Sequence, residues 1–318
     1  MPPGGPGGGL LPLPTPAKRY PLPEWIRPGI AFTYQEMGGQ LSQVFLVTDV
    51  VGDEAYGLEL TLMSLPGSTP MVDLKATPLV QGGVGFFYAN PEAVADYLQM
   101  TRQNPERGVR VTGGNGLFAV EVQNQNGTLR YAFRYDPKTG LVQEIAVSTR
   151  FAGQQGQGAT AANYRYVGYD TFAWQSPADF PPAARESHVY EILAAVPGYG
   201  GSPGMTNPMG QVEVRALRLS KPLALFQLQA NLQGYPQSDT VGGLTALGPH
   251  YLHPELIRRG NVFVLSQLGL SYTIQGDTAT LTWGQVPLSV LRVQPQTGRI
   301  VERQEATPLG QIVYRLAR

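Results

Sequence analysis

One serine in this sequence has the local surroundings of a catalytic nucleophile. Ser202 lies in Gly200-Gly201-Ser202-Pro203-Gly204, which fits the G-x-S-x-G turn that exposes the reactive serine of many hydrolases. The residue after that serine must donate its backbone N–H to the oxyanion, and Pro203 has no N–H to donate. We therefore expect no serine hydrolase, and no catalytic residue is assigned.

A metal site is the second chemistry to consider. His250 and His253 are three residues apart, and Glu255 follows them, so the three side chains offer a set of metal ligands. His253, however, precedes a Pro-Glu pair as Asn90 does earlier in the chain, and this position favours capping of a helix. We expect no metal site and no cofactor.

The remaining histidine, one aromatic run and the carboxylate pairs can each be explained by a structural role instead of a functional one. His188 corresponds to Ile30 when the two halves of the chain are aligned, which favours a structural role. The run Phe86-Phe87-Tyr88 either packs in a core or lines an apolar pocket, and both alternatives stay open. Carboxylate pairs such as Glu302 and Glu305 fall on alternating strand positions, where exposure to solvent is the default.

Composition limits the classes of function. The chain has 318 residues, no cysteine, and 23 basic against 23 acidic residues, so thiol chemistry is excluded and nucleic acid is not an expected partner. Charged residues make up only 14%, while 39 glycines and 28 prolines indicate a turn-rich β protein. No apolar run approaches the roughly 18 residues that would span a membrane. Low charge with abundant Gly, Pro and Tyr is typical of exported β proteins, so we expect an extracellular or cell-envelope protein whose signal peptide is absent from this numbering.

The elements that would position these residues come from an internal duplication. Residues 134–144 (RYDPKTGLVQE) return as residues 292–302 (RVQPQTGRIVE), with five identical positions at a spacing of 158 residues. Each copy predicts a strand, a Pro-x-Thr-Gly turn whose glycine takes positive φ, and a returning strand. A repeat at half the chain length predicts two related domains.

The same alternation of strands and one helix is expected in each half. Strands with a period of two residues precede a helix that begins at Pro91 in the first copy and at Pro254 in the second, where it ends near Gly260. A meander of strands follows each helix. We therefore predict an all-β protein with minor helix, built from two tandem duplicated antiparallel β-meander domains, each a sandwich or a half-barrel, with boundaries 20–175 and 176–318.

The first 19 residues form a Gly/Pro-rich tail, which is expected to be a linker or an inter-subunit connector. Prolines at 12, 14 and 16 alternate with Leu11, Leu13 and Thr15. In an extended strand the prolines would then block one edge, while the other three residues donate to a neighbouring strand. This pattern predicts self-association by strand addition.

A meander with a D-P-x-T-G hairpin beneath one helix resembles the half-barrel domains of periplasmic lipoprotein carriers. The resemblance implies a hydrophobic ligand held on a concave sheet, and it transfers no residue role. Three functions remain open from the sequence. The first is a non-enzymatic structural or assembly protein of the cell surface, such as a surface-layer or filament subunit. The second is an extracytoplasmic binding protein for a hydrophobic or glycan ligand, and the third is a hydrolase.

Overall fold

The computed structural model describes residues 13, 18–103, 109–124, 127–151, 159–196, 205–307 and 310–317. The chain divides into two compact units, residues 1–59 with 77–169 and residues 60–76 with 170–318. The main division lies close to the boundary predicted at residue 176, and it also assigns residues 60–76 to the second unit. Each unit is described by itself.

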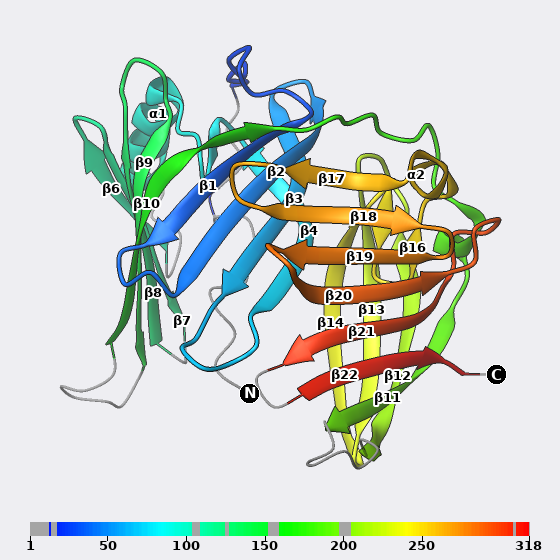
Figure 1. Ribbon diagram of the computed structural model, residues 1–318. Coiled ribbons are helices and arrows are strands. Elements are labelled where there is room, and N and C mark those ends of the chain that lie inside the picture. The colour runs from blue at the N-terminus through cyan, green and yellow to red at the C-terminus, as the bar shows by residue number, and fades with distance from the viewer. Residues whose placement is uncertain are drawn as a thin grey trace. The chain divides into compact units, whose positions relative to one another are not determined.

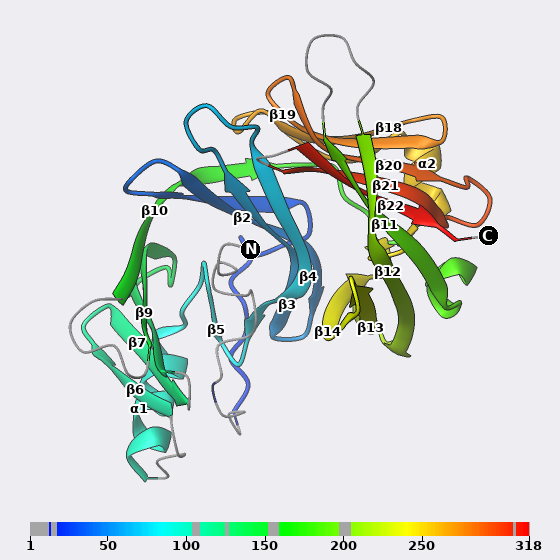
Figure 2. The same ribbon diagram turned by 90° about the horizontal axis from the view of Figure 1, so that it is seen from below.

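In the described residues, the first sheet is antiparallel and contains ten strands. Their spatial order is β5 (Val84–Gly85), β4 (Met71–Gln81), β3 (Glu54–Met63), β2 (Leu41–Val51), β1 (Ile30–Glu36), β10 (Ala159–Thr171), β9 (Val142–Phe151), β8 (Gly127–Tyr135), β7 (Leu117–Asn124) and β6 (Val109–Gly114). Helix α1 (Pro91–Gln103) lies beside β6, as Figure 2 shows.

The second sheet also contains ten antiparallel strands within the described ranges. Their order is β14 (Tyr235–Leu244), β13 (Leu223–Leu232), β12 (Met205–Arg218), β11 (His188–Val196), β22 (Gly310–Leu316), β21 (Ile300–Thr307), β20 (Val286–Val293), β19 (Thr278–Trp283), β18 (Leu270–Gln275) and β17 (Asn261–Leu265). The short pair β15 (Leu247–Gly248) and β16 (Tyr251–Leu252), the 3₁₀ turn η1 (Pro182–Arg185) and helix α2 (Pro254–Arg259) complete the unit. Within this sheet β17–β22 run across the view and β11–β14 run down it, so the sheet curls strongly (Figure 1).

The two sheets repeat one strand order, which confirms the predicted duplication. In each, the first strand of the half lies at the centre and pairs with both the second strand and the last strand. The copies differ around the helix: β5 belongs to the first sheet, whereas β15 and β16 form a separate pair; α2 has 6 residues where α1 has 13; and β17 is added to the second sheet. The fold is therefore all-β with two tandem meanders, and one of the sheets forms a half-barrel.

Both helices begin where the sequence predicts. The Asn90 side chain accepts hydrogen bonds from the backbone N–H groups of Glu92 (2.9 Å) and Ala93 (3.3 Å). The His253 ring accepts from the N–H of Glu255 (3.1 Å), and α2 ends at Gly260 with φ 77°. Neither helix of the described chain is long and apolar enough to cross a membrane.

The Pro-x-Thr-Gly turns have the same hydrogen bonds in both units. The N–H of Gly140 donates to the carbonyl of Asp136 (2.7 Å), and the N–H of Gly298 donates to that of Gln294 (2.8 Å). The glycines have φ 73° and 75°, a region that side chains with a Cβ disfavour. The duplicated sequence is therefore a duplicated turn.

Large aromatic side chains fill the first unit. Phe32 stacks on Phe87 with ring centroids 4.4 Å apart, and Phe45 stacks on Phe86 at 5.6 Å. In the second unit, one core cluster contains the buried side chains of Tyr190, Phe226 and Tyr251. Phe172, Phe263 and Tyr272 are further buried aromatic residues of that unit.

Substitution of the turn glycines tests the importance of the duplicated hairpin. A Cβ at Gly298 would lie 2.3 Å from the Leu252 carbonyl oxygen, and a Cβ at Gly140 would lie 2.5 Å from the Tyr88 ring. Gly298→Ala and Gly140→Ala should therefore lower the melting temperature clearly. Gly276→Ala is the matched control, because Gly276 has φ 62° but no atom within 4 Å of its Cβ position. It should show only the left-handed backbone penalty of about 1–2 kcal/mol, and equal effects at all three glycines would contradict the expectation.

Candidate functional site

The helix entry and the hairpin are joined by the same backbone contacts in both units. The N–H of Val142 donates to the carbonyl of Phe87 (3.1 Å), and in the second unit the N–H of Ile300 donates to the carbonyl of His250 (3.0 Å). A tyrosine hydroxyl from the central strand also reaches each of these residues. Tyr34 donates to the Val142 carbonyl (2.7 Å) and Tyr190 to the Ile300 carbonyl (2.8 Å).

These contacts correct the alignment of the two halves at the central strand. The sequence alignment paired Tyr190 with Phe32 and His188 with Ile30, but the hydroxyl contacts make Tyr190 the counterpart of Tyr34. His188 is then the counterpart of Phe32, two residues earlier on the same face of its strand. The alignment was wrong by two residues because the spacing of 158 at the hairpin does not hold at the central strand.

With this register, a buried pair of phenylalanines in the first unit corresponds to a buried pair of histidines in the second. Phe32 and Phe87 stack at 4.4 Å, whereas the rings of His188 and His250 lie 5.1 Å apart. His250 is fully buried and His188 is 6% exposed. The same position of the fold therefore accommodates either two phenylalanines or two histidines.

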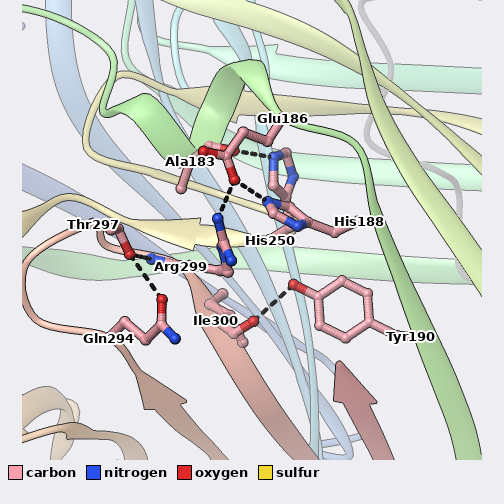
Figure 3. A network of polar contacts seen from close by, with 9 residues as sticks. All are labelled: Ala183, Glu186, His188, Tyr190, His250, Gln294, Thr297, Arg299 and Ile300. Atoms are coloured by element: carbon pink, nitrogen blue, oxygen red, sulfur yellow. Dashed lines mark hydrogen bonds and ion pairs between the residues drawn. The ribbon is translucent and has the colours of Figure 1, made fainter. Parts of the chain in front are cut away.

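The histidines belong to a polar network that Figure 3 shows. His250 Nε2 donates to the carbonyl of Ala183 (2.9 Å), which leaves Nδ1 as the bare nitrogen of a neutral ring. Glu186 binds the guanidinium of Arg299 and lies 3.7 Å from His188 Nε2. Three buried nitrogens of this network have no hydrogen-bond partner in the described part of the chain, namely His188 Nε2, His250 Nδ1 and Arg299 Nε. Buried nitrogens without partners are rare, which makes this network a candidate for function.

Burial keeps both rings neutral near pH 7. It lowers the pKa of His250 to about 4, and the adjacent His188 acts in the same direction. It also lowers the pKa of His188, with help from the Arg299 charge, while Glu186 opposes the shift. Burial therefore favours the neutral form of both histidines.

The other predicted chemical residues do not converge. His253 caps α2 rather than facing His250, and no group of three His, Asp or Glu side chains able to hold a metal occurs among the described residues. Glu302 pairs with Arg315, while Glu305 pairs with Arg303. Ser202 and its flanking glycines lie outside the described residues.

The three aromatic residues proposed as a pocket lie in the core of the first unit. Phe86, Phe87 and Tyr88 are 8%, 0% and 4% exposed. Phe86 and Phe87 stack on other rings, and Tyr88 contacts Trp25 edge to face at 5.6 Å. Their role in binding an apolar ligand stays a prediction.

Of the three tail residues predicted to pair in a strand, the structure describes one. Leu13 is half-buried and packs against the core of the first unit. Leu11 and Thr15 lie outside the described residues. Just after the tail, Tyr20 is buried and its hydroxyl donates to Asp96 of α1 (2.5 Å). Strand addition by the tail stays a prediction.

An open groove lies on the outer face of β11–β14 in the second unit. Alternate residues of these strands, such as Tyr190 and Val212, face the core, so their neighbours face outward. The groove is a shallow, open depression of about 480 Å³, and most of its lining residues are exposed. Its lining consists of Val189, Gln211, Glu213, Gln229, Ala230, Asn231, Pro236, Gln237 and Ser238.

Strand register arranges seven of these nine residues in two rows on the outer face, while Ala230 and Gln237 pair with each other in the row between them, and Ala230 packs against the core. One row runs through Val189, Glu213, Gln229 and Ser238, and the next through Gln211, Asn231 and Pro236. The Ser187 hydroxyl donates to Glu213 (2.8 Å) and so fixes one carboxylate oxygen at the groove. Next to the groove, Arg215 donates twice to Gln227, at 2.8 and 2.5 Å.

Sequence reasoning missed both the groove and the histidine pair. The alternation of Gln211, Glu213 and Arg215 with buried residues marks the outer face of a strand, but it does not show that the amides of β12 and β13 align. The histidine pair was hidden by the alignment error of two residues. A search for the tyrosine two residues after His188 and Phe32 would have found it.

Comparison with known proteins adds no function-specific information. No protein family and no curated protein matches the sequence. The chain has a weak structural similarity to MucB, solved in complex with MucA(peri), at 12% identity and a TM-score of 0.22, covering 92% of this chain and 89% of that one. It is also similar to a protein of unknown function from the DUF3598 family of Nostoc punctiforme, at 10% identity and a TM-score of 0.17, covering 92% and 96%. Scores this low support no argument about function.

Acid should destabilise the second unit through its histidines. Because the folded pKa of His250 (about 4) lies below the ordinary value of 6.5, its contribution to stability is complete above pH 6.5 and is lost as pH falls towards 4. The loss amounts to about 3 kcal/mol for His250 alone. Thermal unfolding between these pH values measures it.

The double variant His188→Phe/His250→Phe, which copies Phe32 and Phe87, should remove most of this dependence. His253→Asn, which copies Asn90, is the control. Burial also lowers the pKa of His253, so this variant should lose that smaller part of the dependence and retain the part due to His188 and His250. A wild-type melting temperature that does not change with pH would contradict the assignment.

Proposed function

We propose that the protein is a non-enzymatic, extracytoplasmic binding protein, and that its second unit binds a neutral glycan in the groove on β11–β14. The groove's lining is the observation that carries the proposal. The side-chain amides of Gln211 on β12 and Asn231 on β13 form one pair, and the next outward-facing pair joins the Glu213 carboxylate to the Gln229 amide. The ligand should therefore be a molecule with many hydroxyl groups.

The chemistry of the lining separates a glycan from other ligands. Each side-chain amide both donates and accepts hydrogen bonds, and a carboxylate accepts only, so together they match hydroxyls that do both. No Lys or Arg is among the lining residues, and Glu213 would repel an anion, so phosphate and acidic ligands are disfavoured. Val189 and Pro236 add some apolar surface for the carbon faces of a sugar ring.

A binding role agrees with the structural roles of the histidines and carboxylates, the side chains that catalysis would need. The three histidines lie in a buried pair and a helix cap, and the Glu302 and Glu305 carboxylates each pair with a different arginine. The extracytoplasmic location rests on composition, namely 14% charged residues with many glycines and prolines.

Glycan binding can be tested on the intact chain. Cellotetraose and chitotetraose should bind at neutral pH in isothermal titration calorimetry, and a glycan array should show neutral oligosaccharides above sialylated or phosphorylated ones. Glu213→Ala and Gln229→Ala should each weaken binding about fivefold or more, since one hydrogen bond contributes about 0.5–1.5 kcal/mol and more when it is charged.

Gln275→Ala is the matched control, because Gln275 is an exposed glutamine of the same unit on β18, outside the groove. It should bind like the wild type. Failure of every neutral oligosaccharide on the array, or equal loss in Gln275→Ala, would overturn the proposal.

Self-association through the tail, as in a surface-layer or filament subunit, is the second candidate function. The alternation of prolines at 12, 14 and 16 with Leu11, Leu13 and Thr15 favours it. The packing of Leu13 against the first unit instead favours a tail that stays with its own chain.

Deletion of residues 1–16 distinguishes the two roles of the tail. Both units should remain folded, with a loss of stability of no more than about 1–2 kcal/mol from the removal of one half-buried leucine. If the tail connects subunits, light scattering and electron microscopy should show that assemblies of the full chain disappear on deletion. Assemblies that survive deletion would reduce the tail to a linker.

A further inference from the structure

The start of β11 connects the histidine network to the groove. Successive side chains of residues 186–189, at and just before the start of β11, point alternately to the inner and the outer face of the sheet. Glu186 and His188 belong to the network, whereas the hydroxyl of Ser187 donates to Glu213 and Val189 lines the groove. A movement of this short segment therefore changes both places at once.

The network has two alternative pairings of one carboxylate. While His188 is neutral, Glu186 binds Arg299. A proton on His188 would create a second cation 3.7 Å from the same Glu186 oxygen, and the two cations would then compete for it. His250 also disfavours protonation of the pair. Its ring centroid lies 5.1 Å from that of His188, so two protonated rings would repel each other.

The surroundings offer little else to compensate for an added charge. From β11 the pair is faced by Glu186 and Tyr190, from the residue before β21 by Arg299, from β16 by Tyr251, from β13 by Phe226, and from η1 by the Ala183 carbonyl. Glu186 is the carboxylate that contacts the pair in the described residues, and Arg299 is a cation that opposes protonation. In the first unit Phe32 and Phe87 occupy these positions, so that unit has no such sensitivity.

We propose that protonation of the His188–His250 pair releases Glu186 from Arg299, displaces residues 186–189, and so weakens glycan binding in the β11–β14 groove. The protein would hold its glycan near neutral pH and release it in acid. The inference rests on the proposed function for its binding step, whereas the displacement of residues 186–189 can be measured without any glycan. Burial agrees with the direction, because it lowers the pKa of both histidines and keeps the closed arrangement neutral near pH 7.

Hydrogen exchange on the full chain tests the displacement directly. Between about pH 7.5 and pH 5, and after correction for intrinsic exchange, peptides that contain residues 186–189 and 211–213 should lose protection in the wild type. They should keep it in His188→Phe/His250→Phe, which copies the pair of the first unit. His188→Gln, neutral at every pH, serves as a second variant should the double variant fold poorly. Equal loss of protection in the wild type and in a folded variant would overturn the switch.

Calorimetry with cellotetraose and chitotetraose tests the consequence for binding. We expect the wild type to bind about tenfold more weakly at about pH 5 than at pH 7.5, which corresponds to one pKa unit of coupling. The histidine variants should show little change, which also separates the effect from titration of Glu213 in the groove. Affinity that falls equally in the wild type and in the variants would overturn the coupling. Absence of binding at pH 7.5 in all proteins would overturn the proposed function alone, and the exchange experiment would still decide the switch.

Discussion

Both units depend on one set of backbone hydrogen bonds between the segment before the helix and the strand after the Pro-x-Thr-Gly turn. Val142 and Ile300 each donate to that segment and accept from the hydroxyl of a tyrosine on the central strand. Val142 and Ile300 thereby each connect the segment before the helix to the central strand. These contacts hold the strands that follow the helix against the first strands of the same unit. The turn glycine permits this approach because a side chain would overlap the adjoining carbonyl or ring.

Because the framework occurs twice, equivalent positions of the two units can be compared. At one equivalent position the framework holds two stacked phenylalanines in the first unit and two histidines in the second. Phenylalanine rings satisfy the packing with no polar atom to bury, whereas the histidines leave two ring nitrogens without hydrogen-bond partners in the described structure. Packing at this position therefore does not explain the histidines, and we assign them the proposed role in responding to acid.

The groove and the histidine network lie on opposite faces of the part of the sheet formed by β11–β14. Alternation along β11 and β12 places Tyr190 and Val212 inside and Val189 and Gln211 outside, so each strand contributes to both. A single sheet thus carries both the proposed glycan-binding groove and the buried histidine pair.

The sequence alone determined the all-β class, the duplication, both helix starts and both turns, because these follow from local patterns: period-two alternation, Asn90 and His253 before proline, and glycine at a left-handed position. It also assigned a cap rather than a metal to His253. The tertiary structure decided the rest. Only cross-strand contacts show that His188 meets His250, since the two are 62 positions apart and the copies shift by two residues between the hairpin and the central strand. Strand register likewise aligned the amides of β12 and β13 into a groove, and register depends on pairing between strands rather than on any one segment.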